Sequence, residues 1–258
     1  MSPTGPRLSY RPADAGIAAP ADYPDAPISL VIERSTPGAD IFGVSVAIGG
    51  DIPLHYHSMM EFQYVVSGAG LALNADGDEI PIGPGGTVVS PGGAAGAHGF
   101  RNTGALPLTL LCLYPCPGGA TPDRFPFDPE IDPGGGPRTR YVGPHRLRPE
   151  AASGDARVAR ILDEADAGAE FHATTTAISG ETPLHHHPAF ETQFVVAGTG
   201  MVIDADGRET AIAPGGIVAC PAGPSGAHAF RSTGTLPLQL LCVWPSADGS
   251  APDTIEAP

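Results

Sequence analysis

The sequence predicts an all-β protein built from two similar β-barrels in tandem. Short apolar segments alternate along the chain with turn signals such as Asp76-Gly77 and Gly83-Pro84. Many short strands between regular turns are typical of a sandwich or barrel. Residues 53–115 also align with residues 183–245 without a gap, at an offset of 130 residues, with 35 identities in 63 positions. Such an internal repeat indicates two copies of one small β-domain.

The repeat predicts the organisation of the 258-residue chain. We expect an N-terminal arm or loop (1–26), a first domain (27–115), a linker rich in Pro and Gly (116–148), a second domain (149–245) and a C-terminal tail (246–258). The linker composition does not build a core. Phe125 and Phe127 are expected to pin the linker onto the surface of a domain.

Composition excludes several classes of protein. All 13 basic residues are Arg and the net charge is −15. Without Lys, neither Schiff-base chemistry nor a phosphate-binding P-loop is available. The acidity argues against nucleic acid and anionic membrane surfaces as partners. No run of about 18 apolar residues could span a membrane, and the N-terminus lacks the apolar segment of a signal peptide. Cys112 and Cys242, which occupy equivalent positions in apolar strands, are expected to be buried thiols. We therefore expect a cytoplasmic protein.

Two matching clusters of histidine and glutamate carry the chemistry. His55 and His57 project to one face of a strand, because side chains at i and i+2 share a face there. A straight strand would carry Glu61 about 13 Å beyond His57, so the chain is predicted to fold back between them. A distant strand supplies His98. The second copy repeats the set as His185, His187, Glu191 and His228.

Three imidazoles and one carboxylate suit a divalent transition metal. We expect two such ions per chain, one in each repeat. Fe(II) is the expected ion, and Mn, Ni, Cu, Co and Zn are alternatives. Open coordination positions would remain for water, dioxygen or a substrate.

With these residues in view, the chain resembles the cupin superfamily, and specifically a bicupin. The first cupin motif is matched by Gly49, His55, His57, Glu61 and Gly68, and in the second copy by Gly180 (one residue closer), His185, His187, Glu191 and Gly198. The second motif, with a loop two residues longer, is matched by Gly85, Pro91, Gly93, His98 and Asn102, and by Gly215, Pro221, Gly223 and His228, where Ser232 replaces the Asn.

The resemblance implies a double-stranded β-helix, or jelly roll, for each half, with a metal near one end of each barrel. Metal-dependent bicupins include quercetinase-like dioxygenases, oxalate decarboxylases, isomerases and cyclases of secondary metabolism, and ureidoglycine aminohydrolases. In several of them the glutamate also accepts a proton, which implies catalytic roles for Glu61 and Glu191.

Strand parity suggests further pocket residues. Gln63 and Gln193 share the face of the glutamates, where they either touch a ligand or orient the carboxylate. Phe100 and Phe230 share the face of His98 and His228, and His172 precedes the second cluster. The bends at Met59-Met60 and Ala189-Phe190 predict apolar mouths, whereas Arg101 and Arg231 are expected to point outward.

Three functions remain open. The leading hypothesis is a metal-dependent oxidoreductase, a dioxygenase acting on an enol-containing or aromatic metabolite with dioxygen as co-substrate. The second is a non-redox isomerase, cyclase or decarboxylase that polarises a carbonyl. The third is a non-catalytic cupin that binds a small molecule. A homodimer is left open.

Overall fold

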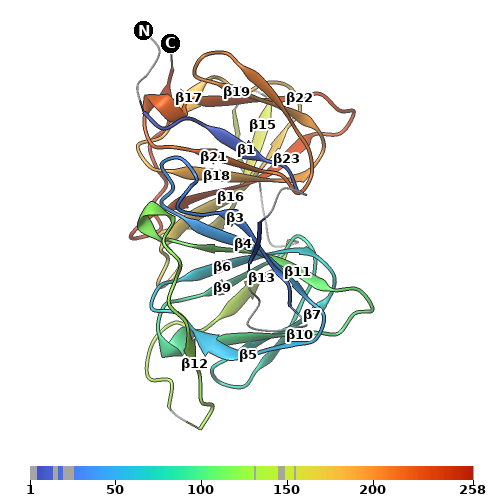
Figure 1. Ribbon diagram of the computed structural model, residues 1–258, viewed down its shortest axis with the longest axis vertical. Coiled ribbons are helices and arrows are strands. Elements are labelled where there is room, and N and C mark those ends of the chain that lie inside the picture. Colours follow the sequence, from blue (N-terminus) through green and yellow to red (C-terminus); the bar gives the residue numbers. More distant parts are fainter. Residues whose placement is uncertain are drawn as a thin grey trace.

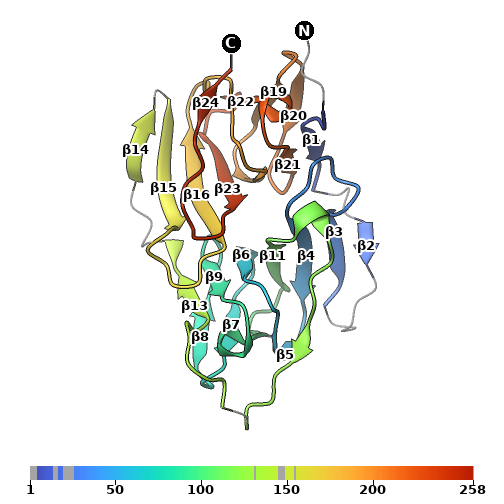
Figure 2. The ribbon, with the colours of Figure 1, turned by 90° about the vertical axis from the view of Figure 1, so that its left-hand side faces the viewer.

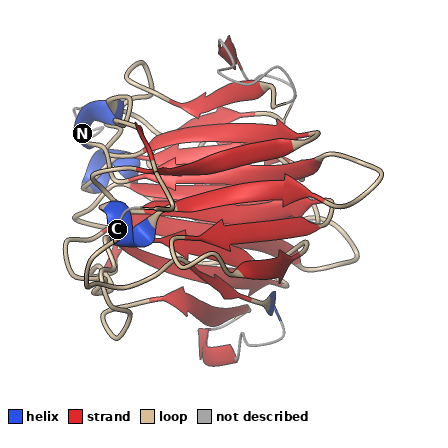
Figure 3. Ribbon diagram, turned by 90° about the horizontal axis from the view of Figure 1, so that it is seen from below, coloured by secondary structure: helices blue, strands red, loops and turns tan. Residues whose placement is uncertain are grey.

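The computed structural model describes residues 5–13, 17–19, 26–130, 132–144, 149–153 and 155–257. They form two β-barrels, each made of a seven-stranded and a five-stranded sheet (Figure 1). Strands dominate the molecule, and helical structure is confined to short turns (Figure 3). The all-β, two-barrel prediction is therefore confirmed. The expected domain limits near residues 26 and 148 adjoin residues 20–25 and 145–148, which lie outside the described part.

The first barrel follows the first repeat. Its seven-stranded sheet contains β2 (Ile17–Ala19), β3 (Ile28–Ile32), β4 (Phe42–Ile48), β6 (Glu61–Ser67), β9 (Thr87–Ser90), β11 (Leu108–Tyr114) and β13 (Arg140–Val142). Its five-stranded sheet contains β5 (Asp51–Tyr56), β7 (Gly70–Asn74), β8 (Glu79–Ile82), β10 (His98–Asn102) and β12 (Phe125–Pro126). The short 3-10 helices η1 (Ala94–Gly96) and η2 (Pro117–Gly119) lie in its loops.

The second barrel repeats this plan. Its seven-stranded sheet contains β1 (Ser9–Arg11), β14 (Pro149–Ser153), β15 (Ala156–Leu162), β16 (Phe171–Ile178), β18 (Glu191–Ala197), β21 (Ile217–Cys220) and β23 (Leu238–Pro245). Its five-stranded sheet contains β17 (His185–His186), β19 (Gly200–Asp204), β20 (Glu209–Ile212), β22 (His228–Ser232) and β24 (Ile255–Glu256). The 3-10 helix η4 (Pro224–Gly226) matches η1.

Equivalent glycines fix equivalent turns in the two barrels. Gly68 has a φ of 81°, and a Cβ built there would lie 2.5 Å from the carbonyl oxygen of Pro107. Gly198 has a φ of 76° and would meet Pro237 at 2.4 Å. Only glycine combines this left-handed backbone with so close an approach, so the turn after β6 and the turn after β18 keep the same shape.

Each barrel receives a strand from the segment that precedes the other barrel. β1, from the N-terminal arm, pairs with β21 of the second barrel, and β13, from the linker, pairs with β9 of the first (Figure 2). Tyr10 and Tyr141 end up in matching places, where each hydroxyl accepts a backbone N–H at 3.2 Å. The arm thus contains two strands where only an arm or loop was expected. The partner of β1 lies about 200 residues away, whereas β2 pairs with β3, the next strand of the chain.

The outer faces of the two seven-stranded sheets form a shared hydrophobic core. Phe62 of β6 meets Phe171 of β16 edge to face, with ring centroids 6.2 Å apart. Met60 and Phe190 are fully buried in the same cluster. The prediction that these two side chains line the mouths of the barrels is therefore wrong: they pack between the barrels. No helix among the described residues is long and apolar enough to cross a membrane.

Candidate metal centres

Four side chains meet inside the first barrel. His55 ends up beside His98, because β5 and β10 are antiparallel neighbours and these residues face each other in the register. The chain then bends after His57, as predicted, and Glu61 opens β6 in the opposite sheet. One ligand atom from each of the four residues lies within 4.8 Å of all the others.

Backbone carbonyls orient the three imidazoles of this centre. In each ring Nδ1 lies against a carbonyl oxygen, which can only accept a hydrogen bond, so Nδ1 carries the proton and Nε2 keeps its lone pair. The acceptors are Pro53 for His55 (2.9 Å), Gly96 for His98 (3.1 Å) and Asp123 for His57. Three Nε2 lone pairs are thereby available on the metal side.

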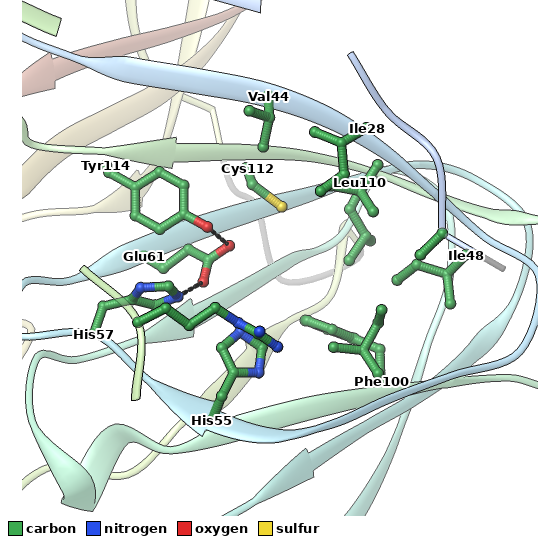
Figure 4. Close-up of a pocket in the computed structure, with 14 residues that line it drawn as sticks. Ile28, Val44, Ile48, His55, His57, Glu61, Phe100, Leu110, Cys112 and Tyr114 are labelled. Carbon is green, nitrogen blue, oxygen red and sulfur yellow. Dashed lines mark hydrogen bonds and ion pairs between the residues drawn. The ribbon is translucent and has the colours of Figure 1, made fainter. Parts of the chain in front are cut away.

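Glu61 is held from two directions. Its Oε1 accepts a hydrogen bond from the Tyr114 hydroxyl at 2.6 Å, and its Oε2 lies 3.1 Å from Nε2 of His57 (Figure 4). Oε2 also lies 2.7 Å from Nε2 of His98. Burial raises the pKa of Glu61, but the electrostatic attraction of the His98 and His57 rings outweighs it and holds the pKa well below its usual value. The carboxylate is therefore the stable form.

The second barrel contains the matching centre. One ring nitrogen from each of His185, His187 and His228 lies within 4.8 Å of the others. Glu191 lies against two of these rings, with Oε2 3.3 Å from Nε2 of His187 and 3.1 Å from Nε2 of His228. Again every Nδ1 faces a carbonyl, here of Pro183 (2.9 Å), Asp253 (2.8 Å) and Gly226 (3.0 Å).

These residues fit a divalent metal ion. Nε2 of His57 and Oε2 of Glu191 are buried and have no hydrogen-bond partner among the described residues, although buried polar atoms are normally paired. Burial, helped by His98, lowers the pKa of His55 to about 3, and burial, helped by His228, lowers that of His185 to about 4. Both rings are thus neutral near pH 7. In His57 and His228 burial is outweighed, by Glu61 and by Cys220 with Glu191 respectively, and their pKa values are raised, so a metal ion would have to displace protons from these two rings.

A cavity opens beside each centre, and the two differ in size. The first has a volume of about 110 Å³ and largely apolar walls that include Val44, Ile48 and Phe100 (Figure 4). The second has a volume of about 460 Å³. Phe230 and His172 line this larger cavity.

The two glutamines lie behind the centres, and neither is among the residues that line the cavities. Gln63 is fully buried and donates to the Ser90 hydroxyl at 3.2 Å. Nε2 of Gln193 lies 3.3 Å from Nε2 of His228, and its Oε1 accepts from the Cys220 thiol at 3.4 Å. None of these contacts reaches the carboxylate of Glu61 or Glu191, so both roles open from sequence, contact with a ligand and orientation of the carboxylate, stay predictions.

Three contributions were not anticipated from sequence: the Tyr114 hydroxyl, the Asp123 carbonyl and the Arg124 side chain, which lines the first cavity. The repeat carried a signal for the Asp123 carbonyl alone, because Pro122-Asp123 and Pro252-Asp253 keep the offset of 130 beyond the aligned region. Arg101 points outward as predicted, since it pairs with Asp51 and Glu79 on the exposed surface.

Solved structures with the same architecture include oxalate decarboxylases and a globulin. A variant of the oxalate decarboxylase of Bacillus subtilis has a TM-score of 0.74 at 13% identity, covering 99% of this chain and 81% of its own. The formate complex of the oxalate decarboxylase of Lactobacillus farciminis has a TM-score of 0.71 at 16% identity, covering 99% and 89%. Procruciferin, an 11S globulin of Brassica napus, has a TM-score of 0.72 at 13% identity, covering 98% and 86%.

At these identities the likeness establishes the fold. No curated protein matches the sequence. The family described as Cupin domain matches twice, at residues 43–114 and 174–244, which together make up more than half of the chain. The chain therefore belongs to the cupin domain family and is a bicupin, with one candidate metal centre in each of its two domains.

Proposed function

We propose that this bicupin is a metal-dependent enzyme that acts on a small organic metabolite, with Glu61 and Glu191 as proton acceptors. The observation that carries the proposal is the pairing of each centre with an internal cavity: the ligand atoms point where a small molecule could reach the ion. The fold alone does not indicate an enzyme, because an 11S globulin shares it.

The finer proposal is a dioxygenase that uses Fe(II) and acts on an enol or an aromatic hydroxyl compound. A metal ion in such a centre would supply a Lewis acid and, for iron, redox chemistry. Apolar side chains line the cavity beside each centre, for example Phe100 in the first and Phe230 in the second, and they support the proposal because they would exclude water from a reactive site. Glu61 and Glu191 are buried and ionised, and a metal ion would lower the pKa of a bound hydroxyl group so that either carboxylate could take its proton.

A specific observation favours a second candidate, a non-redox decarboxylation or isomerisation. Arg124 places a guanidinium in the wall of the first cavity, and a guanidinium binds carboxylates strongly. Oxalate decarboxylases share the fold. For this chemistry the first cavity would hold a small carboxylate between Arg124 and the metal ion.

Oxygen consumption separates the two candidates. The test uses chain purified from its native host, with its own metal, and a panel of enols, catechols and small carboxylates in an oxygen electrode. The dioxygenase proposal expects uptake with an enol or catechol, and loss of uptake in the His57→Ala and His187→Ala double variant. Turnover of a carboxylate without oxygen uptake, lost in Arg124→Ala, would replace it with the second candidate. Absence of any turnover would contradict the enzyme proposal.

A further inference from the structure

The two barrels are copies of one sequence, yet they present different walls to their cavities. β16 and β4 occupy the same place in the repeat, and alternate residues of each face inward. In β16 the inward positions are His172, Thr174 and Thr176, which all line the second cavity. The equivalent residues of β4 are Phe42, Val44 and Val46, which all belong to the apolar core of the first barrel. The second cavity thus has a polar stripe that the first lacks.

The two barrels also differ at the residue of the neighbouring strand that lies beside this stripe. Tyr114 in the first barrel donates its hydroxyl hydrogen to Glu61. Its equivalent, Trp244, lines the second cavity and is only 8% exposed. The indole N–H of Trp244 is buried without a hydrogen-bond partner among the described residues. A buried N–H without an acceptor is costly, and a ligand in the cavity could supply that acceptor.

His172 completes the polar wall. Its Nδ1 lies 3.1 Å from the carbonyl oxygen of Gly249, so the neutral ring keeps its acceptor at Nε2. The ring stands beside Trp244, with centroids 5.7 Å apart. An indole, an imidazole and two hydroxyl groups therefore lie along one wall of the cavity. Ile178, Leu240 and Phe230 add apolar wall, and Thr182, Thr254 and Glu256 line the cavity as well.

The volume of the second cavity and the charges on its wall restrict the class of ligand that it can bind. At about 460 Å³ the second cavity is in the range of small-molecule sites, roughly 300–1,000 Å³. The first, at about 110 Å³, is smaller than the roughly 150 Å³ cavity known to admit benzene. Among the described residues, no Arg lines the second cavity, and Glu191 and Glu256 do. The chain has no Lys at all. An uncharged ring compound fits this wall better than a carboxylate.

We infer that the second barrel is the substrate-binding barrel, and that it takes an uncharged ring compound with hydroxyl groups along one edge. His172, Thr174, Thr176 and the Trp244 N–H recognise that edge, and the apolar wall holds the ring. The inference rests on the proposed function and deepens it, because it assigns the organic substrate to one of the two centres.

Trp244 makes the inference testable without turnover, because it is the single tryptophan of the chain and its ring lies 5.4 Å from that of His187. Catechol, titrated into the metal-loaded full-length protein, is expected to change the tryptophan emission saturably, and oxalate is not. Thr174→Val and Thr176→Val keep the side-chain shape, and each is expected to weaken catechol binding about fivefold, the factor for one hydrogen bond of about 1 kcal/mol. His172→Phe, which copies the first barrel, is expected to abolish it.

The first barrel supplies the matched controls. Val44→Thr and Val46→Thr are expected to leave the catechol titration unchanged, and all variants should keep the metal content of the parent. The inference is overturned if catechol gives no saturable response, if oxalate gives the same one, or if both threonine variants bind catechol as the parent does. Catechol binding without turnover of any compound would contradict only the proposed enzyme. Turnover that the threonine variants leave unchanged would contradict only this assignment.

Discussion

Tyr114 shows how one side chain can set the state of a metal ligand. Its phenol points at Oε1 of Glu61, and this leaves Oε2 for the metal side. Burial, together with the charge of Glu61, raises the pKa of Tyr114 well above its usual value, so the phenol stays protonated and donates. Groups that orient a metal ligand in this way commonly affect metal affinity by about 10–100-fold.

Replacement of Tyr114 by Phe removes this hydrogen bond and keeps the ring, which stands edge-on to His57 with centroids 5.0 Å apart. We expect the metal affinity of the first centre to fall by about tenfold or more, as measured by competition with a coloured chelator. Tyr141→Phe is the control, because the Tyr141 hydroxyl bonds to the main chain of Gly83 and not to a metal ligand. It should leave the metal affinity of the first centre unchanged. Equal affinities in Tyr114→Phe and the parent would refute a supporting role.

At the scale of elements, each barrel is closed by a segment outside its aligned repeat. The linker runs along β5 as β12, and its Asp123 carbonyl accepts from His57. The tail runs along β17 as β24, and its Asp253 carbonyl accepts from His187. Phe127 is buried and Phe125 stacks on Tyr56, so this pair fixes the linker on the first barrel. The linker and the tail thus each supply the main-chain carbonyl that orients one histidine of a metal centre.

A chain ending at Pro245 lacks β24 and the Asp253 carbonyl. We expect it to lose the metal ion of the second centre and to keep that of the first. The emission of Trp244 should shift to the red, because Ala251, Pro252 and Thr254 share the wall of its cavity. Asp253→Ala is the matched control: the acceptor is a main-chain oxygen, so metal content should stay at the parental level. A truncated chain that still binds two ions would contradict the role of the tail.

The sequence predicted the metal-ligand side chains better than the groups that orient them. Strand parity and the repeat determine that His55, His57, Glu61 and His98 converge. The carbonyls behind the rings belong to the main chain, so no residue type marks them. The prediction for Met60 and Phe190 failed because a side chain at the bend can point either into the mouth of its own barrel or toward the other barrel. The apolar surface of the other barrel, a distant part of the chain, buries both side chains.

At the scale of the whole molecule, the two barrels share one core. Phe171 is fully buried between them and faces Phe62, while Tyr64 and Phe194 make a second ring pair across the same interface. The exchange of β1 and β13 ties the two barrels together again. Unfolding one barrel would expose the apolar face of the other, so we expect the barrels to unfold together.

Phe171→Ala tests this coupling. The truncation should lower the free energy of unfolding by about 3–5 kcal/mol, measured by chemical denaturation. Trp244 fluorescence reports on the second barrel and far-ultraviolet circular dichroism on both, and the two curves should coincide. Leu236→Ala, at a residue 70% exposed, should stay within about 0.5 kcal/mol of the parent. A loss below about 1 kcal/mol in Phe171→Ala, or separate transitions, would show that the barrels are independent.

The account depends most on the presence of one metal ion in each barrel. Metal content per chain, measured by elemental analysis of the parent, His57→Ala, His187→Ala and the double variant, tests this directly. The predicted result is two ions in the parent, one in each single variant and none in the double variant. The Tyr56→Phe and His186→Ala controls, which replace the residues between the ligand pairs and keep the ring that stacks on Phe125, should keep both ions. Unchanged metal content in either single variant would contradict the assignment of that centre.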